Sequence, residues 1–148
     1  LRLAASMWDK IGIRTKIDVI SESEFMRLRK SGSLTCYTAQ WMADYNDPDN
    51  FIYTFFGDRE NTTFRSLCYP REDVMERVRL ARTIPDPEER IREYQDLERI
   101  IVQEDAGWIP LYSRLRFYVT SRRLEGIQAS WNGSVKNKYR EMSIVTGD

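Results

Sequence analysis

The sequence predicts an α/β fold, because helical and strand patterns alternate along the first third of the chain. Apolar residues recur at helical spacing in 1–11, at every second position in 13–19, at helical spacing again in 21–32, and densely in 34–41. The connections are short, and a helical crossover makes the two strands of such a unit parallel. At 148 residues and 41% hydrophobic composition, the chain can bury a sizeable core.

The first four elements follow from local patterns. The first helix carries an apolar stripe: Leu1, Ala4, Ala5, Trp8 and Ile11. Gly12 provides a left-handed stop, and the strand after it has one apolar or β-branched face: Ile13, Thr15, Ile17 and Val19. Ser21 or Ser23 is expected to cap the second helix, which ends at Gly32. The stretch 34–41 is rich in Thr and aromatic residues, which predicts the second strand.

The middle of the chain combines loop signals with apolar clusters. Residues 44–50 are rich in Asp, Asn and Pro and predict a loop. An apolar cluster follows and is expected to pack under that loop: Phe51, Ile52, Tyr53, Phe55 and Phe56. Residues 57–72 have the composition of a loop, and Asp73 is expected to cap a helix whose apolar face is Val74, Val78 and Ala81.

The clearest helix start is the sequence DPEE, residues 86–89. Asp86 suits the N-cap, Pro87 the first helical position, and the two glutamates the positive helix end. An apolar stripe expected in the core follows: Ile91, Tyr94, Leu97, Ile100 and Ile101. Gly107 and Pro110 are expected to end this helix. Alternation over 111–119 predicts a strand, and Met142–Val145 predicts a last short one.

The composition excludes several functional classes. Lys plus Arg and Asp plus Glu balance at 23 each, so the chain lacks the basic field that nucleic-acid binding needs. The arginines at 114, 116, 122 and 123 are therefore expected to form a solvated strand edge. No apolar run reaches the length of a membrane span. The chain begins at Leu1 within a helical pattern, and we expect it to be an internal portion of a longer protein.

The sequence offers little catalytic or metal-binding chemistry. It contains no histidine, so a Ser/His/Asp or Cys/His set cannot form, and it has no phosphate-binding glycine loop. Cys36 and Cys68 are expected to be small buried apolar side chains, although one disulfide is possible by count. An acidic pair, Asp44 and Asp47, could serve a hydrolase, but two neighbouring aspartates are common in loops. We expect no enzyme, no cofactor and no metal site.

The stretch WMADYNDPDNF, residues 41–51, is the strongest functional feature because it places aspartates among aromatic side chains. Asp44 follows the strand predicted at 34–41, with Trp41 and Tyr45 beside it. Ligands of open α/β sheets collect at the carboxyl ends of strands, and a carboxylate between aromatic rings suits an ammonium. The spacing of these residues alone favours a second interpretation, in which Asp44 caps the turn and the aromatic side chains belong to the core.

Five segments carry a resemblance to one family. The most specific is WMADYNDPDNF, which resembles the W-x-A-D-Y-x-D/E-P signature of periplasmic oligopeptide- and dipeptide-binding proteins, the family 5 solute-binding subunits of peptide ABC transporters. Four more segments resemble this family in the same order: LAASMWDKIGIRTKIDVI, DPEERIREYQDLERIIVQED, WIPLYSRLRFYVTSRRLEGI and VKNKYREMSIV. Together they span nearly the whole chain.

The resemblance implies the C-terminal lobe of a two-lobed, type II periplasmic-binding-protein-like fold. Residues 1–110 would form part of the ligand-binding lobe. Residues 111–148 would form the hinge strand and the return segment to the N-terminal lobe. The mechanism implied is closure of the two lobes around the ligand, which buries it from water.

The resemblance also implies a ligand-binding set on residues 40–45. Asp44 would pair with the α-ammonium of a peptide, and Trp41 would wall the side-chain pocket. The backbone around Gln40 and Met42 would offer hydrogen bonds to the peptide. Tyr45 is expected to be either a ligand contact or an anchor of the loop.

The implied function is that of a solute-binding receptor that captures peptides or related amine-bearing solutes. Its partners would be ABC permease subunits, with no nucleic acid and no membrane span of its own. Its location would be extracytoplasmic, in the periplasm or on the cell surface as a lipoprotein. The alternative is the ligand-sensing C-terminal domain of a transcription regulator with a similar solute-binding fold.

Overall fold

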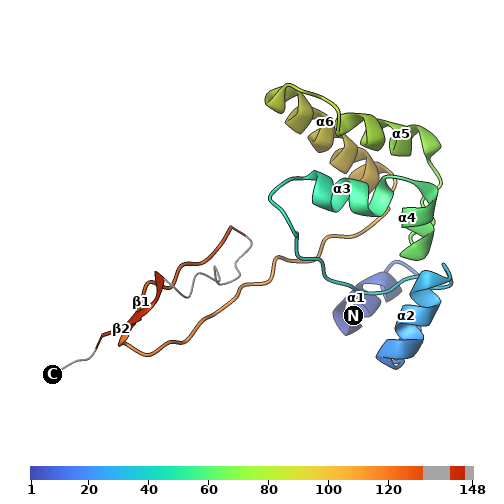
Figure 1. Ribbon diagram of the computed structural model, residues 1–148. Coiled ribbons are helices and arrows are strands. Elements are labelled where there is room, and N and C mark those ends of the chain that lie inside the picture. Colours follow the sequence, from blue (N-terminus) through green and yellow to red (C-terminus); the bar gives the residue numbers. More distant parts are fainter. Residues whose placement is uncertain (132–140, 146–148) are drawn as a thin grey trace.

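A computed structural model describes residues 1–131 and 141–145, and helices dominate it (Figure 1). The first half contains α1 (Arg2–Asp9), α2 (Glu22–Lys30), α3 (Asp49–Phe56) and α4 (Arg59–Phe64). It continues with α5 (Glu72–Ala81) and α6 (Pro87–Arg99), and α6 runs directly into a π-helix, η1 (Ile100–Glu104). Two short strands, β1 (Leu124–Glu125) and β2 (Ser143–Ile144), pair antiparallel.

The helix boundaries confirm several local predictions. Ser21 is the N-cap of α2, and its side chain accepts a hydrogen bond from the Glu24 backbone N–H at 3.2 Å. Asp86 caps α6 by accepting from the Glu89 N–H at 2.7 Å, with Pro87 in the first turn. Gly12 follows α1 with a φ of 83°, a left-handed conformation that favours glycine. These signals depend on neighbours in sequence, and each one forms as predicted.

Two predictions in the middle of the chain are wrong. Residues 57–72 are not only loop, because Asp58 caps the short helix α4 by accepting from the Asn61 N–H at 2.7 Å. Asp73 is not a cap either, since α5 begins at Glu72 and its N-cap position is Arg71. The Asp73 carboxylate instead pairs with the Arg71 guanidinium at 2.7 Å.

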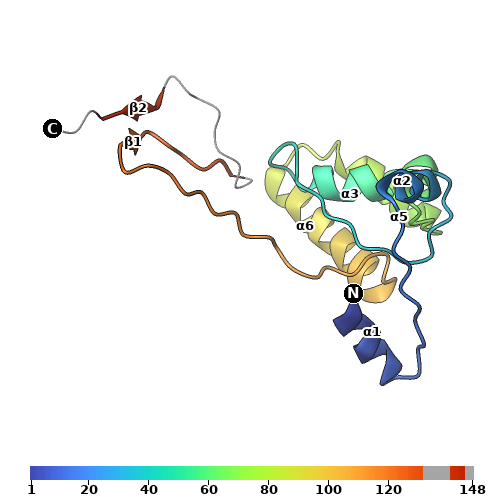
Figure 2. The same cartoon turned by 90° about the horizontal axis from the view of Figure 1, so that it is seen from below.

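The hydrophobic core lies between α3, α5, α6 and η1, which pack together on one side of the molecule (Figures 1 and 2). Its buried members are Ile52, Phe55, Phe56, Tyr69, Val74, Met75, Val78, Ala81, Tyr94, Leu97, Ile100 and Ile101. The predicted apolar face of α5 is therefore confirmed. The stripe of α6 is confirmed with one exception, because Ile91 is 43% exposed.

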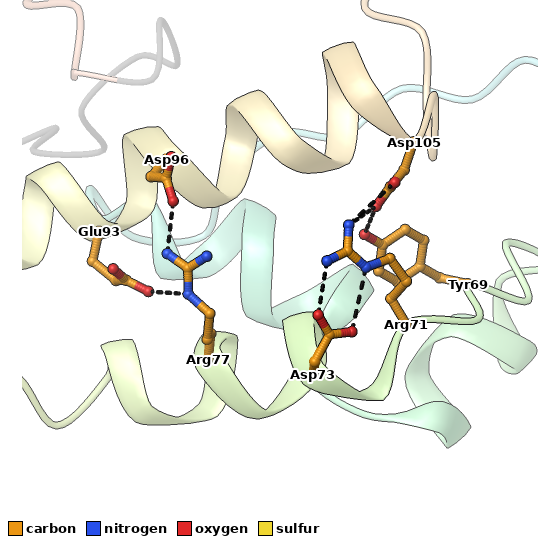
Figure 3. A network of polar contacts seen from close by, with 7 residues as sticks. All are labelled: Tyr69, Arg71, Asp73, Arg77, Glu93, Asp96 and Asp105. Carbon is orange, nitrogen blue, oxygen red and sulfur yellow. Dashed lines mark hydrogen bonds and ion pairs between the residues drawn. The ribbon is translucent and has the colours of Figure 1, made fainter.

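Arginine-centred networks join α5 to α6 and η1 at the surface of this core (Figure 3). Arg77 on α5 contacts Glu93 at 2.8 Å and Asp96 at 2.7 Å, both on α6. Near the start of α5, Arg71 contacts Asp105 at 3.4 Å, and the buried Tyr69 donates its hydroxyl to the same carboxylate. Ion pairs thus join α5 to α6 along their contact, and they join the start of α5 to the end of η1.

Three of the predicted strands do not form within the described residues. The segments 13–19, 34–41 and 111–119 have no strand assignment, and Figure 1 shows the last as an extended arm that leaves the helical body. A strand exists only when a second backbone pairs with it, so an alternating pattern cannot produce one alone. The prediction at 142–145 is confirmed by β2, and the described part is therefore helix-rich with few strands.

The two cysteines also differ from expectation. Cys36 and Cys68 are exposed and free thiols, not buried apolar side chains. Cys36 lies in the extended segment before Trp41, and Cys68 lies just after α4 with a positive φ of 48°. In the described part of the chain, every helix is too short or too polar to cross a membrane.

Candidate functional site

Residues 40–44 line a wide concavity that is open to solvent. Its lining comes mostly from 35–44 and 105–118, with further residues from α1, α3, α6 and the segment 66–70. Four of the predicted ligand-binding residues line it: Gln40, Trp41, Met42 and Asp44. Tyr45 is not part of this lining. The structure therefore brings most of the predicted set to one surface.

Asn50, in the first turn of α3, holds two of these residues. Its side-chain oxygen accepts the Trp41 indole N–H at 2.8 Å and the Asp44 backbone N–H at 3.1 Å. Asn50 is 2% exposed, whereas Trp41 is 39% exposed and rests edge-on against Phe55, with ring centroids 5.2 Å apart. One edge of the indole is thus fixed by the core while part of its surface faces the concavity.

The buried carboxylate of the stretch belongs to Asp49, not to Asp44. Asp49 is 6% exposed and accepts hydrogen bonds from the Tyr45 hydroxyl at 2.6 Å and the Tyr94 hydroxyl at 3.2 Å. The Nε of Arg82 forms an ion pair with the same carboxylate, at 3.0 Å. The hydrogen bond to Asp49 raises the pKa of Tyr45, and burial is the main cause of the raised pKa of Tyr94. Both tyrosines therefore remain protonated donors at neutral pH.

Asp44 itself is exposed, so the expectation of a strand carboxylate enclosed by aromatics is wrong in that respect. The turn is capped by Asp47, whose side chain accepts the Asp49 backbone N–H at 2.8 Å. Tyr45 anchors the loop through its hydroxyl and is still 46% exposed. The interpretation that Trp41 and Tyr45 belong to the core is therefore also wrong, since both side chains keep large exposed surfaces.

Asp47 ties the loop to α6 through a bidentate pair with Arg90. The guanidinium nitrogens Nη1 and Nη2 contact the two carboxylate oxygens at 2.7 and 2.8 Å. Arg90 also lies over the Tyr94 ring, 4.9 Å from its centroid. The hydrogen bonds from Arg90 are the main reason that the pKa of Asp47 lies below its ordinary value.

This lowered pKa gives a pH prediction. Because the folded-state pKa of Asp47 is below 3.8, its pairing stabilises the fold above that value and is lost as the pH falls through the folded pKa. Asp47→Asn is expected to lower the free energy of unfolding by about 1 kcal/mol at pH 7. The difference should shrink below about pH 4.

Urea unfolding of both proteins between pH 2.5 and 7 measures this effect. Asp18→Asn, at an exposed carboxylate beside Lys16, is the control and should leave the stability near that of the parent throughout. A constant difference between Asp47→Asn and the parent across the whole range would show that the pair contributes nothing through its charge.

Met42, one of the remaining site residues, contacts the extended arm. Arg116 donates a hydrogen bond to the Met42 sulfur at 2.7 Å, which joins segment 111–119 to the stretch. Gln40 lies two residues before Met42 and is exposed. Among the described residues, no group of three His, Cys, Asp or Glu side chains could hold a metal ion. Asp47 and Asp49 are instead engaged by arginines.

Sequence patterns do not identify the residues that hold the binding stretch from the side of the core. Asn50, Arg82 and Arg90 are not among the predicted site residues. Asp49 belongs to the acidic cluster of the stretch, but the sequence does not distinguish it from Asp44 and Asp47. An Asp-Pro pair ahead of an apolar helix is a signal for a side-chain-capped turn, and it would have pointed to Asp47. The arginines lie 33 or more positions further along, and no local pattern identifies them.

Comparisons with known proteins give one family. Residues 1–63 match the family model described as bacterial extracellular solute-binding proteins, family 5, middle region. The chain is 28% identical over 141 residues, 93% of its length, to a dipeptide-binding protein of Escherichia coli strain K12, of which it covers 25%.

Two further relatives differ in their named ligands. The chain is 26% identical over 145 residues to the periplasmic oligopeptide-binding protein OppA of Salmonella typhimurium, covering 91% of this chain and 25% of that protein. It is 27% identical over 119 residues to heme-binding protein A of Haemophilus influenzae, covering 80% and 22%. The chain thus spans about a quarter of the length of the curated relatives it matches.

Proposed function

We propose that this chain forms part of a receptor for peptides or related amine-bearing solutes, because residues 1–63 match the model of the family 5 bacterial extracellular solute-binding proteins. The receptor would deliver its ligand to the permease subunits of an ABC transporter. Its location would be extracytoplasmic, either free in the periplasm or anchored at the cell surface. Relatives named as dipeptide- and oligopeptide-binding proteins support this, because the similarity covers more than nine tenths of the chain.

The observation that carries the proposal is that one Asn50 oxygen ties an exposed indole, Trp41, to the backbone of an exposed aspartate, Asp44. Asp44 and Trp41 line the same concavity, and the Asn50 oxygen binds a backbone or side-chain N–H of each. A cation placed there would gain charge pairing with Asp44 and a cation–π contact of about 0.5–2 kcal/mol with the indole. A protonated amine is the group that such a pair recognises. Met42, Gln40 and Tyr45 would complete the contacts around it.

The two-lobed fold of the family gives the extended arm a role. We propose that residues 1–110 belong to the ligand-binding lobe and that residues 111–148 include the connection to the other lobe. The arm leaves the helical body directly after η1 and exposes an alternating apolar face, which is what a strand that pairs elsewhere would present (Figure 1). Arg116 would keep this connection in contact with the site through Met42.

Calorimetric titration of the full-length protein tests the proposal with a di- to penta-peptide library and its N-acetylated counterpart. Asp44→Asn is expected to weaken binding of the free-amine peptides by about 30-fold, because it removes a charged pairing worth about 2 kcal/mol. Acetylation should have the same effect on the parent protein and no further effect on the variant. Asp18→Asn, outside the concavity, serves as the control.

Equal binding of free and acetylated peptides by the parent would reject an ammonium anchor at Asp44. The ligand would then be sought among solutes without an amine, as the relative named for haem illustrates. The transcription-regulator alternative has no support from the comparisons, whose named members are binding proteins.

A further inference from the structure

We infer that Asn50 is the positioning residue of the ligand site, which fixes Trp41 and Asp44 relative to each other; this inference rests on the proposed function. A single carboxamide oxygen accepts from both residues, at 2.8 Å from the indole Nε1 and 3.1 Å from the Asp44 backbone nitrogen. A carbonyl oxygen has two lone pairs, and here both are directed at the binding stretch. Asn50 does not touch the ligand in this role.

The position of Asn50 makes this oxygen a fixed point. Asn50 is 2% exposed and lies in the first turn of α3, two residues before the buried Ile52. The same helix carries Phe55, against which the Trp41 ring rests, so the indole is held by α3 at both its N–H and its ring edge. Because α3 packs in the hydrophobic core, its position is fixed, and so are the Trp41 indole and the Asp44 backbone N–H that Asn50 binds.

Loss of this oxygen would affect the two residues together. An aliphatic side chain at position 50 leaves the Trp41 indole N–H and the Asp44 backbone N–H without their acceptor, and both can find water only by moving. The Trp41 indole and the backbone that carries the Asp44 carboxylate would then no longer be held in one preformed arrangement. Preorganised contacts of this kind reduce the entropic cost of binding. Their loss should therefore weaken binding of the cationic end of the ligand more than binding of the rest of it.

The test therefore measures discrimination and not only affinity. In the full-length protein, Asn50→Leu is expected to lower the ratio of affinities for free-amine and N-acetylated peptides by about tenfold, the loss expected for one to two hydrogen bonds. The affinity for the acetylated peptides should stay within about twofold of the parent. Thr62→Val, a buried polar-to-apolar change in α4 away from the stretch, should leave the ratio unchanged.

A merely structural role of Asn50 would weaken binding of both peptide classes in equal proportion, and that outcome overturns the inference. A parent protein that shows no discrimination rejects the proposed function itself, and the ligand-positioning role of Asn50 falls with it. A parent that discriminates, together with an Asn50→Leu variant that discriminates equally well, rejects the inference alone.

A second measurement needs no variant at position 50. Hydrogen exchange in the ligand-free parent should show slow exchange of the Trp41 indole N–H and the Asp44 amide, with the indole signal assigned by Trp41→Phe. Slowing by about tenfold or more relative to an exposed indole is expected if Asn50 holds both groups. Fast exchange at either site would overturn the inference even if Asn50→Leu does not fold.

Discussion

Phe56→Ala is expected to lower the free energy of unfolding by about 3–5 kcal/mol. Phe56, in α3, is fully buried and packs edge-to-face on two further rings. Its centroid lies 5.2 Å from that of Tyr69 and 5.0 Å from that of Trp108, at interplanar angles of 80° and 85°. Such aromatic pairs contribute about 0.5–1.5 kcal/mol each beyond the burial of area, so the truncation loses packing on two sides. Urea unfolding followed by circular dichroism measures the effect.

Phe64→Ala is the matched control, because Phe64 lies at the end of α4 and is nearly half exposed. Its removal should cost well under half as much. A similar loss for both variants would mean that the packing of Phe56 contributes little beyond its helical position. Since single domains are stable by only about 5–15 kcal/mol, the Phe56 variant should also unfold at markedly lower temperature.

Asp49→Ala should give the second large effect, a loss of about 3 kcal/mol of stability. The change removes the acceptor for the buried Tyr94 hydroxyl and for Tyr45, as well as the ion-pair partner of Arg82. Hydrogen bonds to a charged acceptor contribute about 1.5–3 kcal/mol, and a buried hydroxyl left unpaired adds its desolvation cost. Arg82 is about half exposed and can turn to water, which limits the total.

Asp96→Ala provides a matched control on α6. Asp96 contacts Arg77 on α5 (Figure 3). It also contacts Arg99, and its carboxylate is 41% exposed. Surface pairs of this kind contribute about 0–1 kcal/mol, so this variant should remain close to the parent in urea unfolding. An equal loss at both positions would contradict the importance we assign to burial at Asp49. Asp49→Asn, which keeps an oxygen acceptor, should fall between Asp49→Ala and the parent.

The helical part of the fold could be predicted because its signals are local. Ser21 and Asp86 cap helices through backbone groups three residues away, and Gly12 ends α1 through its own φ. The cluster at 51–56 was recognised as apolar, but its helical form depends on packing against α5 and α6. The short helix α4 begins at the Asp58 cap, whose signal is hidden in a stretch with the composition of a loop.

The strands could not be decided in the same way. An alternating pattern at 13–19 or 111–119 indicates which backbone would fit a sheet, but pairing depends on segments far away in sequence. Within the described residues those partners are not provided, so both segments stay extended. Short-range pairing at the chain's end does form, between Leu124 and Ile144.

The sequence indicates the stretch that carries the candidate site, but it does not indicate the contacts that hold this stretch. The stretch around Trp41 and Asp44 was singled out from its composition, and both residues do line one concavity. Which of the three aspartates is buried could not be predicted, because the contacts that engage Asp47 and Asp49 come largely from the distant Arg82, Arg90 and Tyr94. Tertiary contacts therefore decide which carboxylate stays available to a ligand.

The exposed arm at 111–119 has a consequence for self-association. Leu111, Leu115, Phe117 and Val119 are largely exposed on a segment with high β-propensity and no proline inside it, the composition of a cross-β aggregation site. Arg114 and Arg116 interrupt the apolar run, and their charges repel when identical arms align. Because added salt screens the repulsion between exposed charges, these arginines oppose alignment of the arms most strongly in dilute buffer.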